Sequence, residues 1–259
     1  MTRCVVFALV VLMPAVASAQ ISVERNVIYG MYSGLALLMD VHRPVKANGY
    51  GVVLIPGSGF HAVQGYNATP LKDGRSAAFA YLPVLLDTGF TVFVVNHRAA
   101  PRFRYPSAVE DVQRAVRFIR HEAARYNIRA DRLGVVGYSS GGYLALMLGV
   151  LDGAGDAKAD DPVERESARV QAVVANAANA DLLLDIQIAQ NSSTIASFMG
   201  QLPTIGGGTI EDPIAMGSYR QASPITHVSR STAPLLLIHG DADRTVSFRH
   251  AEEMTTAMQ

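Results

Sequence analysis

The stretch that decides the fold runs from Asp131 to Leu151 and reads DRLGVVGYSSGGYLALMLGVL. A short apolar run, 133–136, meets the turn Gly137-Tyr138-Ser139-Ser140-Gly141, and an apolar helical segment, 142–151, follows. This order predicts a strand, a sharp turn and a helix. The turn fits the pattern G-x-S-x-G, in which small residues let the chain bend so tightly that the central serine projects from the sheet edge. Ser139 is therefore the predicted nucleophile.

The helix predicted after Ser139 also bears on the chemistry. Its first N–H groups lack intrahelical acceptors and carry a partial positive charge, so the N–H of Ser140 is expected to donate to an oxyanion beside Ser139. The five-residue pattern alone also fits an ordinary glycine-rich turn. The buried type of strand before it and the apolar helix after it favour the nucleophile.

The first 19 residues have the character of a secretory signal. Arg3 gives a short positive segment, 5–16 form an apolar core, and Ala17-Ser18-Ala19 places small residues before Gln20. No later stretch has the ~18 to 20 apolar residues of a membrane-spanning helix. We expect a soluble exported protein, periplasmic or secreted. Removing residues 1–19 from the 259 leaves 240, which suits one α/β domain over 20–259.

Cysteine usage and charge narrow the chemistry. The only cysteine, Cys4, lies in the signal, so the mature chain is expected to have no internal disulfide, no thiolate catalysis and no cysteine metal site. Without Arg3 the 22 basic side chains fall to 21, against 22 acidic ones, for a net charge of −1. Nucleic acid and a membrane surface are not expected as partners. No cofactor and no metal are predicted.

Strand-like and helical patterns alternate along the mature chain. The expected strands are 23–29, 35–41, 52–55, 91–95, 133–136, 170–176 and 235–238, and the expected helices are 75–86, 107 to about 126, 142–151 and from 247 onward. Turn-prone residues 32–34 predict an antiparallel hairpin at a sheet edge. The continuous apolar run 52–55 is typical of a parallel strand buried on both faces, so the loop 56–60 lies at the carboxyl edge, where such sheets bind ligands.

Three local expectations complete the fold. Pro83 marks a kink or an early stop in the helix 75–86. Ser107 with Glu110 predicts a capping box at the start of the long helix. Residues 181–232 show no clear period and contain glycine and proline clusters, which predicts an irregular insertion over the site rather than a separate domain. Together the elements predict a doubly wound, mostly parallel sheet with right-handed connections.

Several motifs follow one another along the mature chain: Leu37-Leu38-Met39-Asp40-Val41 before Pro44, Pro56-Gly57-Ser58-Gly59-Phe60, Arg98-Ala99-Ala100-Pro101 through Tyr105-Pro106 to Val109-Glu110-Asp111, Gly137-Tyr138-Ser139-Ser140-Gly141-Gly142, Ala222-Ser223-Pro224, and His239-Gly240-Asp241-Ala242-Asp243-Arg244-Thr245-Val246. With these motifs the chain resembles the α/β-hydrolases, and among them the exported esterases and lipases similar to acetyl-xylan esterases and hormone-sensitive lipase. The motifs span nearly the whole mature chain in the family's order. The resemblance implies an α/β-hydrolase fold and hydrolysis of small carboxylic esters, with acetylated plant polysaccharide as one substrate class.

The resemblance also implies which residues act. Ser139 is the nucleophile that forms an acyl-enzyme, and Asp243 is the acid that orients a histidine; the spacing from His239-Gly240 selects Asp243 over Asp241. A serine hydroxyl is a poor nucleophile until a base takes its proton, and the base needs a carboxylate to fix its tautomer.

The implied oxyanion hole takes N–H groups from Ser58, Gly59 and Ser140. The chain departs here from the commonest family pattern, because Pro56 replaces a histidine and Ser58 replaces a glycine. A serine keeps its N–H group but resists positive φ, so Ser58 is the least secure of the three donors.

The largest departure concerns the base. The family's catalytic histidine lies one strand and one loop beyond the helix after the acid, whereas this sequence stops at Gln259 inside that helix, so we expect a C-terminally incomplete domain that lacks a strand and a helix. The histidines present are His42, His61, His97, His121, His227, His239 and His250. His250 is the remaining candidate, but we expect it on a solvated helix face. His239 is expected to orient the turn.

Two other functions stay open. A non-catalytic binding protein that kept the fold after losing its base fits the missing histidine, but such a protein has no physical need for both the elbow and the acid loop. A peptidase of the same fold usually needs an added domain, for which 240 residues leave no room. The preferred reading is a serine esterase that acts on a small-molecule or carbohydrate ester.

Overall fold

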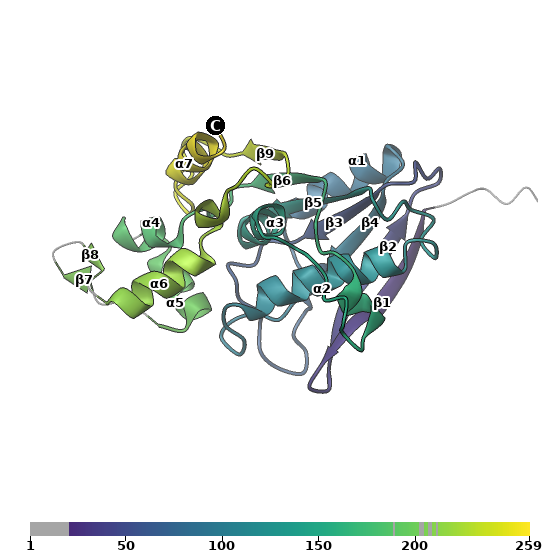
Figure 1. Ribbon diagram of the computed structural model, residues 1–259, viewed down its shortest axis with the longest axis horizontal. Helices are drawn as coiled ribbons and strands as arrows, with labels where there is room; N and C mark the ends of the chain where they lie inside the picture. The colour runs from purple at the N-terminus through teal and green to yellow at the C-terminus, as the bar shows by residue number, and fades with distance from the viewer. Residues whose placement is uncertain (1–20, 189, 202–204, 207–208, 211) are drawn as a thin grey trace, which may run out of the picture.

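The computed structural model describes residues 21–188, 190–201, 205–206, 209–210 and 212–259, so the expected signal over 1–19 lies outside the described residues. One sheet has the strand order β1-β2-β4-β3-β5-β6-β9 (Figure 1). Its strands are β1 (Ser22–Tyr32), β2 (Leu35–Arg43), β3 (Gly51–Ile55), β4 (Thr91–Val95), β5 (Leu133–Tyr138), β6 (Ala172–Asn176) and β9 (Leu235–Ile238). Strands β4, β3, β5, β6 and β9 run parallel to one another, and β2 pairs antiparallel with β4.

The sequence explains this arrangement. β3 and β4 are buried at every position, as continuous apolar runs in a parallel sheet require. β1 and β2 form the expected antiparallel hairpin at the sheet edge, and Ser33 and Gly34 in its turn both have positive φ. The sheet is therefore mostly parallel with an antiparallel edge, as predicted.

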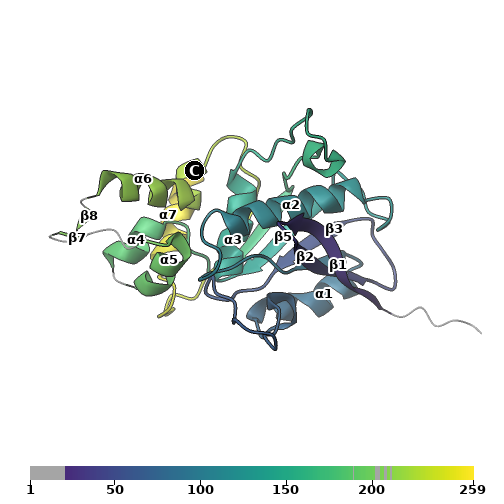
Figure 2. The same cartoon turned by 90° about the horizontal axis from the view of Figure 1, so that it is seen from below.

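Helices cover both faces of the sheet (Figure 2). On one face α2 (Ser107–His121) and α3 (Ser140–Val150) pack over the larger core, and α2 buries an apolar stripe that includes Val109, Val112, Val116 and Ile119. On the other face the short turn η2 (Ala77–Ala80) and α1 (Tyr81–Asp87) cover a smaller core. The doubly wound architecture is thus confirmed.

Two local predictions about helix starts are wrong. The expected helix 75–86 is η2 followed by α1, and Pro83 lies in the first turn of α1, where the missing N–H group costs no intrahelical hydrogen bond. The long helix α2 has Pro106 at its N-cap and no side-chain cap, so Ser107 and Glu110 form no capping box. Glu110 instead accepts a hydrogen bond from Arg98 at 3.0 Å.

The insertion over 181–232 is not irregular where the structure describes it. It holds α4 (Leu182–Gln187), α5 (Ser192–Met199), the short strands β7 (Ile205–Gly206) and β8 (Thr209–Ile210), α6 (Pro213–Ala222) and the turn η4 (Pro224–His227). Asp181 caps α4 and Asp212 caps α6, each through a backbone N–H two residues on. Figure 1 shows these elements grouped at the end of the molecule opposite β1.

The far edge of the sheet is formed by β9, followed by α7 (Arg249–Ala257). Leu236 and Ile238 on β9 are 55% and 39% exposed, and Leu236 pairs in register with Val174 of β6. This edge therefore presents apolar side chains on the same face that α1 covers elsewhere. Among the described residues, no helix has the length and apolar character needed to cross a membrane.

Candidate active site

Ser139 lies at the sharp turn between β5 and α3, as predicted. Its backbone has φ 54° and ψ −122°, a conformation that L residues adopt rarely and at a cost in energy. Its N–H group donates to the carbonyl oxygen of Asn176 at 2.8 Å, and its own carbonyl accepts from the N–H of Tyr143 at 2.9 Å. Neighbouring strand β6 and helix α3 thus hold the strained residue in place.

The glycines of the turn are required by close backbone contacts. A Cβ atom on Gly137 would overlap the carbonyl oxygen of Gly141, and a Cβ atom on Gly141 would overlap the carbonyl oxygen of Ile55 at the end of β3. The helix can pack this closely on two strands only because both positions lack side chains. The G-x-S-x-G pattern therefore forms the tight turn between strand and helix that was expected, and the role of Ser139 as nucleophile stays a prediction.

The loop after β3 lies directly beside the elbow. A Cβ atom on Gly57 would come within 3.0 Å of Ser139 Cβ and 2.5 Å of the carbonyl oxygen of Tyr138. Gly59 and Phe60 have φ of 62° and 63°, so the loop turns sharply away after this approach. The predicted oxyanion loop and the predicted nucleophile are thus brought together.

Ser58, one of the three predicted oxyanion donors, is held by a hydrogen bond from its backbone. The N–H of Ser58 donates to Ser140 Oγ at 2.9 Å, and Ser140 is almost fully buried. The hydroxyl of Ser58 is also buried and has no hydrogen-bond partner among the described residues. Ser58 is therefore tied to the start of α3 by its backbone, while the assignment of Ser58, Gly59 and Ser140 as donors stays a prediction.

Asp243 stabilises its own turn. Its Oδ1 atom accepts from the N–H groups of Thr245 at 2.8 Å and Val246 at 3.0 Å, and its Oδ2 atom lies 3.6 Å from His239 Nε2. His239 Nε2 is also 3.0 Å from the carbonyl oxygen of Val246. His239 orients this turn, as expected, and the role of Asp243 as the catalytic acid stays a prediction.

The prediction that His250 lies on a solvated helix face is wrong. Its side chain is fully buried, and its Nδ1 atom lies 3.3 Å from the backbone nitrogens of Ala180 and Asp181. Because N–H groups can only donate, Nδ1 must be the unprotonated acceptor, and Nε2–H donates to Asp185 Oδ1 at 3.2 Å. Both ring nitrogens are occupied, so this arrangement leaves His250 no free nitrogen for Ser139.

Asp185 is a buried residue that the sequence did not single out. It also accepts from Asn179 Nδ2 at 2.9 Å, and burial raises the pKa of its carboxyl group above the ordinary value despite the hydrogen bond from His250. No motif marked it, since it lies in the segment that lacks a clear period. Asn176, whose carbonyl oxygen accepts from the N–H of Ser139, is in the sequence only the last residue of an expected strand.

His61, two residues after Gly59, also has partners away from Ser139. Its Nδ1 is 2.7 Å from the carbonyl oxygen of Gly59, and its Nε2 is 2.8 Å from Ser197 Oγ on α5. His61 therefore joins the oxyanion loop to the helical insertion. No hydrogen bond between Ser139 Oγ and a histidine occurs within the described part of the chain, and no three His, Cys, Asp or Glu side chains there are placed to hold a metal ion.

The sheet order, the elbow after β5 and the glycine loop after β3 together define an α/β-hydrolase fold. The model of the BD-FAE family matches residues 39–258, and the chain belongs to this family of α/β-hydrolase esterases.

Individual relatives agree with this assignment. The chain is 27% identical over 234 residues to the probable carboxylic ester hydrolase LipM of Mycobacterium tuberculosis, covering 88% of this chain and 50% of LipM. It is 27% identical over 112 residues to an acetylxylan esterase of Xylanibacter ruminicola, covering 42% of this chain and 20% of that protein. The truncated form of a carbohydrate esterase from gut microbiota superposes with a TM-score of 0.71 at 25% identity, covering 94% of this chain and 85% of that one. The chain thus spans about half the length of LipM.

Proposed function

We propose that the protein is a serine esterase that cleaves small carboxylic esters through an acyl-enzyme on Ser139. The observation that carries this proposal is the strained backbone of Ser139 at the edge of the sheet, with the loop at Gly57 packed against it. Backbone strain persists only where surrounding structure enforces it, and it clusters at sites of chemistry. The esterase names of the relatives support the same activity.

The reaction follows from this geometry. Ser139 Oγ attacks the ester carbonyl, the alcohol leaves, and water then releases the acid from the acyl-enzyme. The oxyanion forms beside the N–H groups of Ser140 and Gly59, which need no rearrangement at the moment of reaction. Ser58 contributes by fixing the loop, because its N–H is committed to Ser140 Oγ. Asp243 orients the base.

This proposal does not assign the catalytic base that deprotonates Ser139 to a particular residue. The hydrogen bonds of His250, His239 and His61 are directed at other groups, so we infer that none of these three is the base in the arrangement described. A non-catalytic binding protein remains the second candidate function, and the observation that favours it is the same missing hydrogen bond. The strained elbow argues against it, since binding alone does not require a projecting serine.

The substrate class and the location are part of the same proposal. The names of the acetylxylan esterase and the gut carbohydrate esterase support an acetylated carbohydrate as substrate. Cleavage after Ala19 and export to the periplasm or the medium would bring the enzyme to such polymers. Mass spectrometry of exported protein tests the location: a mature chain that begins at Gln20 supports it, and an intact Met1 contradicts it.

The activity is tested by hydrolysis of p-nitrophenyl acetate by the product of the complete reading frame. The Ser139→Ala variant should lose activity by ~10⁴-fold or more, because only the oxyanion donors and binding remain, while its thermal unfolding should change little. A Ser229→Ala variant removes an exposed loop serine and serves as the matched control. Substantial turnover by purified Ser139→Ala protein would move the nucleophile elsewhere.

A further inference from the structure

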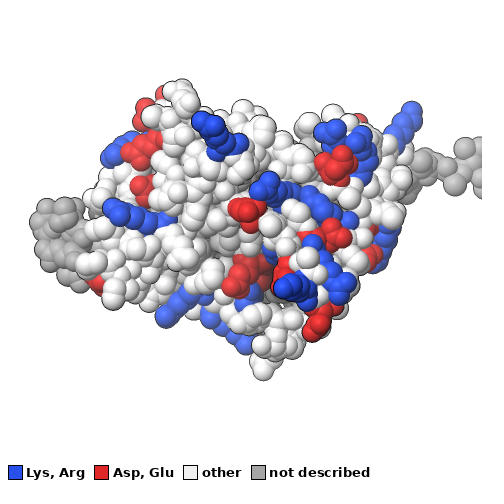
Figure 3. Space-filling model, viewed as in Figure 1, with Lys and Arg blue, Asp and Glu red and all other residues white. Residues whose placement is uncertain are grey.

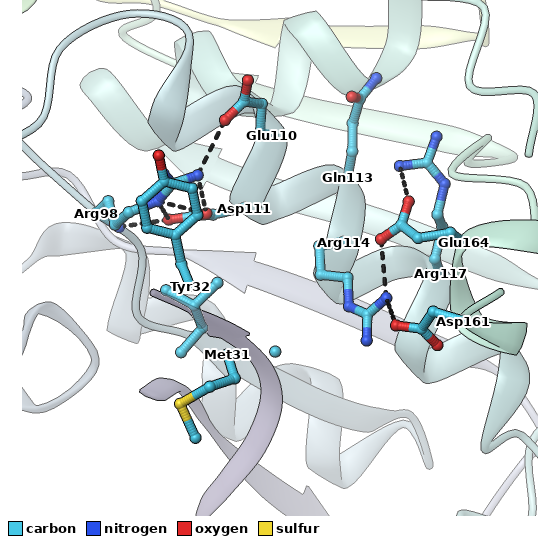
Figure 4. Close-up of a pocket in the computed structure, with 12 residues that line it drawn as sticks. Met31, Tyr32, Arg98, Glu110, Asp111, Gln113, Arg114, Arg117, Asp161 and Glu164 are labelled. Atoms are coloured by element: carbon cyan, nitrogen blue, oxygen red, sulfur yellow. Dashed lines mark hydrogen bonds and ion pairs between the residues drawn. The ribbon is translucent and has the colours of Figure 1, made fainter. Parts of the chain in front are cut away.

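A cavity of about 500 Å³ lies on the outer side of α2, between the end of β1 and the turn η3 (Pro162–Arg165) (Figure 4). This volume is in the range of about 300–1,000 Å³ that small-molecule sites occupy. None of the predicted catalytic residues lines it. The cavity is therefore a separate feature of the molecule that the proposed esterase reaction does not use.

Two groups of ion pairs form the walls (Figure 4). In the first, Arg98 contacts Asp111 at 2.7 Å and Glu110 at 3.0 Å. In the second, Arg114 contacts Asp161 at 2.6 Å and Glu164 at 2.8 Å. Figure 3 shows the same mixture on this face of the molecule, where blue and red side chains alternate over α2 and η3 instead of separating by sign.

This pairing decides which ligands fit. An anion would have to compete with carboxylates that already hold the guanidinium groups of Arg98 and Arg114. A metal ion needs several converging carboxylates without cations between them, and the described residues hold no such cluster. The cavity therefore favours neither an anion nor a metal ion.

The walls still offer free hydrogen-bonding capacity. The side chains of Glu110, Asp161 and Glu164 are 56%, 47% and 40% exposed, so each carboxylate keeps lone pairs that face solvent. Gln113 stands between the two groups and adds an amide donor and acceptor (Figure 4). Acceptors and donors at fixed, alternating positions match vicinal hydroxyl groups, because each hydroxyl both donates and accepts.

One end of the cavity is aromatic and rigid. The guanidinium carbon of Arg98 lies 3.8 Å from the centre of the Tyr32 ring, and the ring meets Phe103 edge-on at 6.4 Å. About half of Tyr32 is exposed. A ring held on one side by a buried cation loses little conformational freedom when its exposed surface packs against the C–H groups of a ligand.

From these features we propose that the cavity between Tyr32, Gln113 and Glu164 is a second, non-catalytic binding site for a neutral polyhydroxylated ligand, a short oligosaccharide segment. Tyr32 packs against the apolar face of one sugar ring, and the carboxylates of Glu110 and Glu164 accept from its hydroxyls with Gln113 between them. Binding here is independent of whether Ser139 is catalytic, since the two sites share no residue.

The test is titration calorimetry of the complete protein with xylotriose, a neutral probe that carries vicinal hydroxyls and no ester. We expect millimolar binding that weakens about tenfold in Tyr32→Ala and several-fold in Gln113→Ala, since 1.4 kcal/mol corresponds to a factor of ten. Glu122→Gln, at the end of α2 and outside the cavity, is the matched control and should bind like the wild type. Thermal unfolding checks that each variant is folded; if Tyr32→Ala is not, Gln113→Ala carries the test.

Three results would overturn the proposal. The first is no heat of binding up to the solubility limit of xylotriose. The second is unchanged affinity in both cavity variants, which would place the sugar elsewhere on the protein. The third is displacement of xylotriose by inorganic phosphate at equal concentration, because a site that prefers an anion would contradict the proposed neutral ligand.

Discussion

The Nε2 atom of His250 lies 3.2 Å from Asp185 Oδ1, and both side chains are completely buried. This hydrogen bond joins α7, which follows the predicted acid loop, to α4, the first helix of the insertion. On its other side the ring accepts from the backbone at Ala180 and Asp181. The imidazole therefore fixes the position of α7 and, seven residues upstream, of Asp243.

Replacing His250 with Ala should destabilise the fold by about 3 kcal/mol or more, because two backbone N–H groups lose their acceptor and the buried carboxyl group of Asp185 keeps only Asn179 as a donor. Urea unfolding at neutral pH measures this loss. His121→Ala is the control, since His121 is partly exposed and its contact with Glu166 is 3.8 Å long, so its effect should stay within about 0.5 kcal/mol. Equal effects of the two substitutions would contradict a structural role for His250.

His97 should make stability depend on pH. Burial lowers the pKa of its imidazole below the ordinary value of 6.5, so the folded protein binds the proton less readily than the unfolded chain does. Its contribution to stability is therefore complete above pH 6.5 and is lost as the pH falls through the window below, by up to about 1.4 kcal/mol per pH unit. In His97→Asn, which keeps a donor for the carbonyl of Arg98, the decline between pH 7 and acid pH should be smaller. Parallel pH curves for the two proteins would exclude His97 as a source of the decline.

Substitution with alanine should lower esterase activity at Gly57 and raise stability at Gly217. A Cβ atom on Gly57 collides with the carbonyl oxygen of Tyr138 and crowds Ser139 Cβ, so Gly57→Ala should displace the oxyanion loop and reduce esterase activity by at least about tenfold. Gly217 lies inside α6 with open space where a Cβ atom would be, so Gly217→Ala should stabilise the protein by about 0.5–1 kcal/mol and leave activity unchanged. Full activity in Gly57→Ala would mean that the loop does not approach Ser139 as described.

The exposed edge at β9 should promote aggregation of the chain that spans 20–259. Leu236 presents an exposed apolar side chain on the edge strand β9, a combination that favours pairing with other chains. Leu236→Lys should slow the growth of light scattering on warming, whereas Val63→Lys, at an isolated exposed loop position, should not. If both substitutions slow aggregation equally, the effect is one of net charge and not of the β9 edge.

The parts of the fold that sequence predicted best are those where backbone contacts dictate the residue type. The tight turn around Ser139 was predictable because Gly137 and Gly141 lie where any side chain would overlap a carbonyl oxygen. Strands β3 and β4 were predictable because burial on both faces demands an unbroken apolar run.

The errors arose where tertiary contacts override a local pattern. Ser107 and Glu110 have the spacing of a capping box, but the buried Arg98 takes the carboxylate. The helices of the insertion were not predicted, because its glycine clusters interrupt the apolar pattern. Asp212 followed by Pro213 is nevertheless a helix-start signal in the sequence. His250 was misplaced because a histidine on a short helix gives no sign of being buried, and only the fold brings Asp185 to it.

The most direct test compares p-nitrophenyl acetate hydrolysis by the 20–259 chain and by the product of the complete reading frame, each with and without Ser139→Ala and His250→Ala. We expect the 20–259 chain to be inactive or nearly so, because no histidine among its described residues is hydrogen-bonded to Ser139, and we expect any activity of the complete product to depend on Ser139. Robust hydrolysis by the 20–259 chain that disappears in a folded His250→Ala variant would mean instead that His250 is the base.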